Sequence, residues 1–535
     1  MGATLGIGYV MTLDMSWGPI RPLGDEVRNT WLLNWVIATL QAFIPGFIVQ
    51  KVILLALFVL AGVGAHHLAA EIKMGKGNHQ ATLLYAAGFL YMINPFMYTR
   101  FVAGQWLVMA GYALLPWAVR AVWRLLQQPS AKAAVKAGGW LAAICLTSIH
   151  AMGFLPFIII VLLAVSGRDH IRAKLGWLTA MGLALILVNL FWLVPLLTGG
   201  SSITSDIASF DSSQMKAFAT HGTVLGNVPL SALLLSGFWA DTELRYILPQ
   251  ATGWLWGVLA VIVLGLVLVG IYRVVRLRDR LGLALLILGA IAWYLSMGIA
   301  WEGSRAVTQW LADTVPMYAG YREPQKWLML LALAYAYLLV HGAVLLYERL
   351  QVLGKRKTIT RAHAQQMGAG LIAVVLLVPF AWTPLELFGA NRQLRSVQYP
   401  VGWQQAKDAL AMRGVDDDTK IVVLPWHMYM TMQFVGRTAA NPAPNYFEGD
   451  IITSNNPELR GLPFETGGPV EDYMNYEFLP SRGQSEVTRH KLRQLGVEYI
   501  LLLKEADYGR YEWLGSLKGL DRVVDNEDVR VYKVE

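Results

Sequence analysis

Residues 326–348 read KWLMLLALAYAYLLVHGAVLLYE, an almost continuous apolar stretch with charge at both ends. A helix needs about 20 apolar residues to cross the roughly 30 Å of hydrocarbon in a bilayer, so this stretch is long enough to span a membrane. The polar run GYREPQKW at 320–327 overlaps its start, and a basic connector follows its end. The two flanks differ in character, and the same difference recurs along the chain.

Nine other apolar stretches of similar length precede or follow this one. The sequence therefore predicts ten membrane-spanning helices, at 47–70, 80–98, 103–125, 133–149, 150–167, 175–197, 253–274, 280–300, 326–348 and 367–389. The pair on either side of His150 is the least regular, because Gly153 and Pro156 interrupt it.

Composition supports the same class of protein. The chain is 55% hydrophobic and 15% charged, with a mean hydropathy of +0.44, whereas a soluble domain carries about 25% charged residues. The formal net charge of +8 does not indicate nucleic-acid binding, because much of the excess lies in short connectors between apolar stretches. The single cysteine, Cys145, excludes an internal disulfide and a cysteine-based metal cage.

The connectors alternate between two kinds. Those after the first, third, fifth, seventh and ninth stretches are basic, which places them on the cytoplasmic side. Their basic residues are Lys73 and Lys76; Arg120, Arg124, Lys132 and Lys136; Arg168, Arg172 and Lys174; Arg273, Arg276, Arg278 and Arg280; and Arg349, Lys355, Arg356, Lys357 and Arg361. The remaining segments are expected outside: 1–46, the turns at Arg100 and His150, 198–252, 301–325 and everything after 390. Both termini then lie outside.

The predicted fold class is a polytopic α-helical membrane protein with a C-terminal extracytoplasmic α/β domain. Residues 1–46 form an external loop in which 29–45 is an interfacial helix, 47–390 form the transmembrane domain, and 391–535 form the α/β domain. Within the last, the pattern predicts helices at 403–413 and 485–495, strands at 420–425 and 498–503, and a closing hairpin from 522–524 and 529–534. The expected location is the cell membrane.

Asp14 lies in the run TLDMSWGP at 12–19. An aspartate among apolar residues near a membrane surface has a tunable pKa, as a general base for a sugar hydroxyl requires. The alternative is a turn residue whose carboxylate is satisfied by local amides. Asp25 and Glu26 are an acidic pair that could begin a helix or help to bind a divalent cation such as Mg²⁺ or Mn²⁺; whether a metal or other cofactor is needed stays open.

Three basic residues in external segments are candidates for binding phosphate. Arg322 and Lys326 are four residues apart and flank Glu323. Both suit a lipid phosphate, because a guanidinium can donate two parallel hydrogen bonds to it and an ammonium supplies a compact positive charge. Arg100 is a basic residue in a predicted external turn, where the positive-inside rule disfavours basic residues, and this suggests that it binds an anionic ligand. His150 is a weaker candidate for acid–base chemistry or for binding phosphate. The alternatives are interfacial residues that extend toward water, with a local Arg–Glu pair, and a helix-end cap for Arg100.

Four runs together resemble a known family: the early loop with Leu-Asp-Met, INPFMYTRFVAGQW at 93–106, LLLSGFWADTELRYILP at 233–249 and GYREPQKW. They are similar to polytopic glycosyltransferases of the GT-C superfamily, in its arabinosyltransferase-like and uncharacterised bacterial and archaeal branches. The run LPWHMYMTMQFVGRTAANPAP at 424–444 is similar to their terminal domain.

The resemblance implies sugar transfer from a polyprenyl-phosphate donor on the non-cytoplasmic face to a glycan, lipid or protein acceptor. The family's essential acidic residue falls on Asp14 and its phosphate-neutralising basic residue on Arg322, or on Arg100 or Lys326. Trp239, Trp426 and Tyr429 are candidate sugar-stacking surfaces of an acceptor groove formed by 198–252 and 391–535, and membrane lipid is a further expected partner.

One departure from the family concerns the start of the chain. The superfamily normally begins with a transmembrane helix before the first external loop, whereas Met1 is thirteen residues before Asp14. Either that helix is missing, or this chain enters the membrane with its N-terminus outside. Two other functions remain: a lipid flippase or transporter, which the scarcity of midplane charge and the lack of repeats disfavour, and a non-catalytic scaffold that binds polysaccharide.

Overall fold

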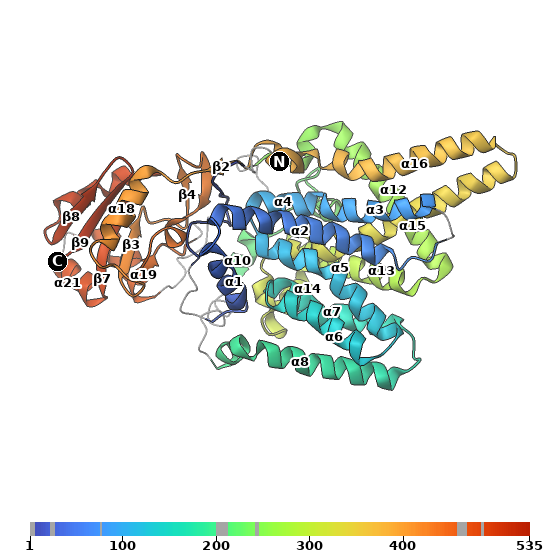
Figure 1. The fold of residues 1–535 in the computed structure, drawn as a ribbon, viewed down its shortest axis with the longest axis horizontal. Coiled ribbons are helices and arrows are strands. Elements are labelled where there is room, and N and C mark those ends of the chain that lie inside the picture. Colours follow the sequence, from blue (N-terminus) through green and yellow to red (C-terminus); the bar gives the residue numbers. More distant parts are fainter. Residues whose placement is uncertain are drawn as a thin grey trace. The chain divides into compact units, whose positions relative to one another are not determined.

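The computed structural model describes residues 6–21, 27–74, 78–198, 212–240, 246–456, 468–482 and 486–535. The chain forms two compact units (Figure 1). One unit comprises residues 24–33 and 53–391 and is helical, and the other comprises 1–23, 34–52 and 392–535 and contains the sheet. Two helices, α1 (Trp31–Gln41) and α2 (Gly46–Ala69), each run from one unit into the other.

The helical unit is a bundle of long apolar helices. Its helices are α3 (Asn78–Met92), α4 (Pro95–Ala103), α5 (Trp106–Gln127), α6 (Ala131–Cys145), α7 (Ile149–Val165), α8 (Ile171–Leu197), α10 (Ser212–Ala217), α11 (Val228–Leu233), α12 (Trp254–Leu277), α13 (Arg280–Ser296), α14 (Glu302–Thr314), α15 (Leu328–Lys355), α16 (Arg361–Trp382) and α17 (Leu387–Asn391). Short 3₁₀ turns are η1 (Pro249–Thr252), η2 (Gly298–Ala300), η3 (Tyr318–Tyr321), η4 (Pro324–Trp327) and η5 (Pro384–Glu386).

Each of the ten predicted stretches overlaps a helix, namely α2, α3, α5, α6, α7, α8, α12, α13, α15 and α16, but the stretch 80–98 is divided, because α3 ends at Met92 and α4 begins at Pro95. In the part of the chain that the structure describes, six helices are long and apolar enough to cross a membrane, and α7, α13 and most of α3 are shorter apolar helices. The chain is a multi-pass membrane protein. The irregular pair around His150 forms two separate helices, because the Ser148 hydroxyl accepts the Ala151 N–H and begins α7 there.

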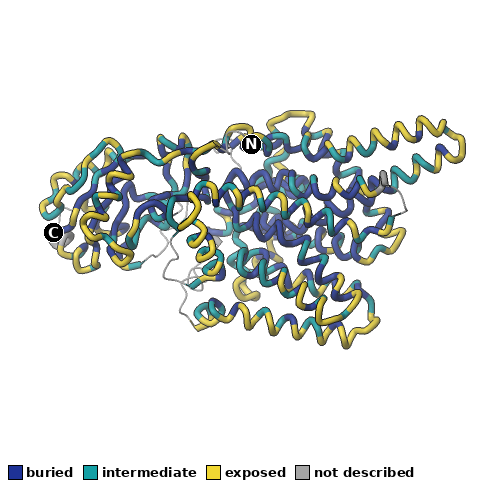
Figure 2. Tube along the Cα trace, in the orientation of Figure 1, coloured by how far each residue is buried: buried dark blue, intermediate teal, exposed yellow. Residues whose placement is uncertain are grey.

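Burial separates a central helix from peripheral ones. In the apolar window of α15, 94% of residues are buried, against 17% in α8 (Figure 2). Large apolar side chains of α8, such as Leu183 and Leu187, are exposed. An apolar helix that is exposed on most sides is suited to lipid, whereas α15 packs against α3, α12, α13 and α16.

Two glycines set the distance between α12 and α15. A Cβ on Gly270 would lie 1.9 Å from the carbonyl oxygen of Leu338, and a Cβ on Gly342 would lie 2.0 Å from that of Leu266. Each glycine therefore faces the backbone of the other helix. Small residues are the usual means by which membrane helices approach closely.

The sheet-bearing unit has three layers. Its five-stranded sheet has the order β6 (Asp450–Ile452), β3 (Lys420–Leu424), β7 (Val497–Leu503), β9 (Val529–Val534), β8 (Leu520–Asp525). The pairs β6–β3 and β3–β7 are parallel, and β7–β9 and β9–β8 are antiparallel. Because strand side chains alternate, Ile421 and Val423 pack with α18 (Val401–Ala411), while Val422 and Leu424 pack with α19 (Pro469–Tyr473) and α21 (Glu486–Gln494).

The sequence-predicted strands and helices of this unit all have counterparts in the structure, within about three residues. Elements that the sequence pattern did not indicate are the hairpin β4 (Tyr429–Met432) with β5 (Arg437–Ala440), the turn η6 (Ala443–Asn445), the π-turn η7 (Met474–Phe478), α20 (Leu479–Ser481) and η8 (Tyr508–Ser516).

The N-terminal segment belongs to this unit. Strand β1 (Tyr9–Val10) pairs antiparallel with β2 (Ser396–Val397), and the Gln50 side chain bonds both the N–H and the C=O of Val10, at 2.9 and 2.7 Å. Gly8 has a φ of +117°, and a Cβ there would lie 2.2 Å from the Val397 carbonyl oxygen. The predicted interfacial helix exists as α1, with Trp35 and Leu40 exposed; its contact with a membrane stays a prediction.

The glycine pair gives a testable prediction. Gly342→Ala should destabilise the helical unit by about 1–3 kcal/mol, because an added methyl overpacks the α12–α15 contact. The measurement is the thermal unfolding temperature of the purified protein in detergent. Gly265→Ala on α12 is the matched control, since its Cβ would meet nothing within 4 Å. Equal unfolding temperatures for the two variants would contradict the close-approach account.

Candidate functional site

Arg100 is held by a short helix whose ends are both capped. The Asn94 side chain accepts the Met97 N–H at 3.1 Å, Pro95 occupies the first position of α4, and Gly104 ends it in the left-handed conformation at φ +82°. The run INPFMYTRFVAGQW thus contains its own start and stop signals. All nine residues of α4 are buried, and Arg100 has 0% of its surface exposed.

Arg100 is part of an ion network with Glu323 and Lys326. Its Nη1 lies 3.2 Å from Glu323 Oε2 and donates to Gln105 Oε1 at 2.6 Å. Lys326 Nζ lies 3.1 Å from the other Glu323 oxygen, Oε1, and 2.9 Å from His150 Nε2. The structure thus brings four sequence-predicted residues together: Arg100, His150, Glu323 and Lys326.

Local structure explains how the network forms. Pro324 begins η4, which leads directly into α15, so Glu323 and Lys326 are fixed at the start of the central helix. The Tyr321 hydroxyl donates to the carbonyl of His150 at 2.6 Å. Gly153 permits this approach, because a Cβ there would lie 1.8 Å from the Tyr321 oxygen.

Electrostatics favour the ionised form of Glu323. Burial by itself raises the pKa of this carboxyl, but the charges of Lys326 and Arg100 outweigh burial and lower the pKa to about 2. Glu323 therefore carries its negative charge at every physiological pH. A buried carboxylate is tolerated where cations and hydrogen bonds compensate the lost hydration.

Arg322 lies apart from the ion network but next to it. Its Nη1 bonds the Gln214 side chain, and its guanidinium lies 4.4 Å from the ring centre of Phe218. Phe218 packs edge-on against Trp239 at 4.8 Å, and Trp239 packs against Phe238 at 5.4 Å. The Arg100 guanidinium lies 4.0 Å from the Phe238 ring. A row of three aromatic rings therefore connects the two arginines through cation–π contacts.

Two of the predicted sugar-stacking residues are buried. Trp239 is the middle ring of this row and is 7% exposed, so it is not an open platform. Trp426 lies in the core of the sheet-bearing unit, where its indole N–H donates to Asn475 Oδ1 at 2.7 Å. Both rings are covered in this structure, as is usual for large aromatic side chains, which contribute most to stability when buried.

Asp14 lies at the tip of a tight turn. Thr12 and Met15 bridge each other, with N–H to O distances of 2.9 and 3.4 Å, and the Ala440 N–H bonds the Thr12 carbonyl at 3.0 Å. The Tyr429 hydroxyl on β4 donates a hydrogen bond to Asp14 Oδ1, with 3.2 Å between the two oxygens. Asp14 is half-buried among fully buried neighbours. The structure thus pairs two predicted residues, Asp14 and Tyr429, that are 415 positions apart.

The remaining predictions concern metal binding. Asp25 and Glu26 lie outside the described residues. Among the residues that the structure describes, no three His, Cys, Asp or Glu side chains are grouped to hold a metal ion.

Gln105 and Gln214 are site residues that no sequence pattern indicated. Gln105 bonds both Arg100 and Glu323 from the position before α5, and Gln214 bonds Arg322 from the predicted external loop 198–252. Gln105 could have been noticed, because it lies within the same run as Arg100. Gln214 has no local signal, because its partner is 108 residues away.

Comparison with solved structures finds the arabinofuranosyltransferase AftD from Mycobacteria, determined by single-particle cryo-electron microscopy. The match has a TM-score of 0.52 and 15% sequence identity, and it covers 99% of this chain and 38% of the AftD chain. No protein-family model and no curated protein match the chain. The chain therefore has a fold similar to that of AftD, in agreement with the fold that the sequence resemblance implied.

The ion network gives a second prediction. Glu323→Gln should destabilise the protein by about 3–5 kcal/mol at neutral pH, because Arg100 and Lys326 would lose their shared counter-charge. Thermal unfolding in detergent measures the change. Glu302→Gln is the control, since Glu302 is exposed on α14.

The same variant has a predicted pH dependence. A carboxyl whose pKa falls from 4.5 to about 2 on folding stabilises the fold fully above pH 4.5, and this contribution is lost as the pH falls toward 2. The difference in unfolding free energy between wild type and Glu323→Gln should therefore be constant from about pH 5 to about pH 8 and become smaller in acid. A difference that grows as the pH falls would contradict the assignment.

Proposed function

We propose that this protein is a membrane glycosyltransferase that transfers a sugar from a polyprenyl-phosphate donor to an extracytoplasmic glycan, lipid or protein acceptor. The observation that carries the proposal is a basic cluster in which Arg100 and Lys326 surround Glu323, with Arg322 close by, in a GT-C-like fold. Guanidinium and ammonium groups are the side chains that bind phosphate.

The basic cluster would bind the donor phosphate. In the reaction the acceptor oxygen attacks the anomeric carbon, the bond from that carbon to the phosphate oxygen breaks, and polyprenyl phosphate leaves. Negative charge grows on the leaving phosphate, so cations fixed beside it stabilise the transition state. Arg322 is the first candidate for this contact, with Arg100 and Lys326 behind it, and His150 and Glu323 hold Lys326 in place.

The cluster is closely packed in this structure. The cavity that Arg322 lines, together with Tyr321 and Thr308, has a volume of about 10 Å³, which is room for about one water molecule. Binding of a donor phosphate therefore requires side chains around Arg322 to move, and the bond between Arg322 and Gln214 would be exchanged for bonds to the phosphate.

Asp14 would act as the general base. Its carboxylate would accept the proton of the acceptor hydroxyl as the new glycosidic bond forms, and a single displacement inverts the anomeric carbon. The hydrogen bond from Tyr429 supports this role, because it fixes the orientation of the carboxylate. Tyr429 is then a positioning residue.

The structure gives less support to a transporter. Arg273, His341 and Asp279 form a largely buried polar group. Arg273 Nη1 lies 3.0 Å from His341 Nδ1, and His341 Nε2 lies 3.1 Å from Asp279 Oδ2. Arg273 lies one turn before the last turn of α12, Asp279 caps the start of α13, and His341 lies within α15. The two permanently charged groups, Arg273 and Asp279, therefore lie near helix ends, whereas transporters place their ionisable residues near the bilayer midplane.

The general-base assignment gives a third prediction. Asp14→Asn should lower kcat for sugar transfer by about 10²–10⁴-fold without weakening donor binding, in membranes with matched protein levels. Tyr429→Phe should lower it less, by about 10- to 100-fold at most, since one hydrogen bond to a carboxylate is lost. Asp417→Asn, in an exposed turn of the same unit, is the control. Full activity of Asp14→Asn would refute the base.

The phosphate contact gives a fourth prediction. Arg322→Gln should lower kcat/KM for the donor by about 10- to 100-fold, the value of a hydrogen bond to a charged group. Arg305→Gln removes an exposed arginine from the same external segment and should change it little. The donor is first identified by mass spectrometry of lipid-linked sugars in cells with and without the protein. Equal effects of the two variants would contradict the assignment.

A further inference from the structure

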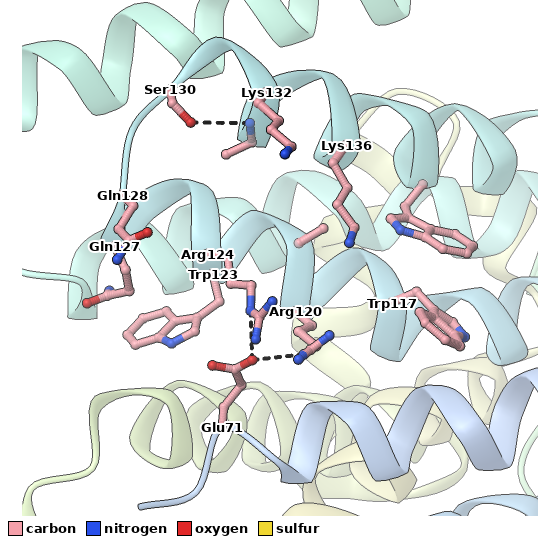
Figure 3. Close-up of a pocket in the computed structure, with 13 residues that line it drawn as sticks. Glu71, Trp117, Arg120, Trp123, Arg124, Gln127, Gln128, Ser130, Lys132 and Lys136 are labelled. Atoms are coloured by element: carbon pink, nitrogen blue, oxygen red, sulfur yellow. Dashed lines mark hydrogen bonds and ion pairs between the residues drawn. The ribbon is translucent and has the colours of Figure 1, made fainter.

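A cavity of about 610 Å³ lies where α5 ends and α6 begins, away from the ion network of Arg100, Glu323 and Lys326. Its walls come from the residues just after α2, the last turns of α5 and the first turns of α6 (Figure 3). Its volume is within the range of small-molecule sites, about 300–1,000 Å³. Since α2 and α5 are each long enough to cross a membrane, the cavity lies close to a membrane surface.

The cavity is strongly basic. Arg120 and Arg124 are four residues apart on α5, and Lys132 and Lys136 are four apart on α6, so each pair lies on one helix face. Glu71 is the only acidic side chain among the residues that line the cavity. Figure 3 shows Lys136 extending from α6 toward the arginines on α5.

Glu71 orients the two arginines without neutralising the cavity. Its Oε1 accepts the Nε–H of both Arg120 and Arg124 at 2.8 Å. Among the described residues, no hydrogen-bond partner is found for the Nη groups of these arginines or for the two lysines. The terminal donors are thus available in a site where an oxyanion could accept several of them.

The wall of the cavity is aromatic. Trp117 on α5 and Trp140 on α6 stack with ring centres 5.0 Å apart and planes inclined by 21°, and buried Trp123 completes the lining. Tryptophans at this level are typical of the boundary between headgroups and hydrocarbon. A phosphodiester joined to an apolar tail matches this lining, because the cations could bind the phosphate and the indole rings could contact the apolar part.

We propose that the cavity binds the phosphate headgroup of an anionic phospholipid in the leaflet next to these helix ends. Basic pockets between transmembrane helices are a recognised means of binding such headgroups. The positive-inside rule accounts for lysines and arginines in this connector, but it does not require four of them to line one cavity. The proposal is independent of sugar transfer.

The test is native mass spectrometry of the full-length protein, purified in detergent and offered phosphatidylglycerol or phosphatidylcholine with the same acyl chains. The wild type should retain phosphatidylglycerol at least about tenfold better than phosphatidylcholine. Arg124→Gln/Lys136→Gln should lose at least about tenfold of this retention. Arg168→Gln/Arg172→Gln makes the same charge change at exposed residues outside the cavity and should keep it.

Three results would overturn the proposal: equal retention of the two lipids, equal loss in the two double variants, or displacement of phosphatidylglycerol by millimolar glycerol 3-phosphate, which would indicate a soluble phosphate ligand. Thermal unfolding without lipid checks that the cavity variant folds. If it does not, Lys136→Gln alone replaces it, because Lys136 has no hydrogen bond to a described residue and its loss should still reduce retention several-fold.

Discussion

The buried carboxylate of Glu323 is the constraint on which the candidate donor site depends. It lies between Arg100 and Lys326, which come from segments more than 220 residues apart in sequence, and each charge is stable in this position because the others are present. Removing Glu323 would leave two buried cations without their shared counter-charge. The network fixes the end of α4, the start of α15 and the first turn of α7 to one another, so it joins three segments that the charge rule places on the same side of the membrane.

The connectors form two groups in space, and this agrees with the alternation of charge in the sequence. Arg100, His150 and Glu323 come from three predicted external segments and lie in one network. Glu71 lies with Arg120 and Arg124, from two predicted cytoplasmic connectors, and Arg280 bonds the Ser166 carbonyl from two others. Both sets of contacts follow from helices that cross a bilayer in alternating directions. Which group faces the cytoplasm stays a prediction.

Much of the fold could be predicted because its signals are local. Apolar length indicated the long helices of the bundle, and alternation located β3, β7 and the β8–β9 hairpin. The N-terminal strand was missed, since β1 has two residues and is defined only by pairing with β2, almost 390 positions later. Residue types and local charge indicated Arg100, Glu323 and Lys326, but not Gln214, whose role arises from tertiary contact. The burial of Trp239 and Trp426 could not be foreseen, because aromatic character does not distinguish a buried ring from an exposed one.

The central claim is that the basic cluster faces the side of the membrane opposite the cytoplasm, where polyprenyl-phosphate sugars would be used. Impermeant thiol labelling of intact cells tests it directly in a Cys145→Ala background, since Cys145 is the only native cysteine. Arg305→Cys, exposed in the segment before the cluster, should be labelled, and Arg168→Cys, exposed in a basic connector, should react only after the membrane is opened. Labelling of position 168 but not 305 in intact cells would contradict the account.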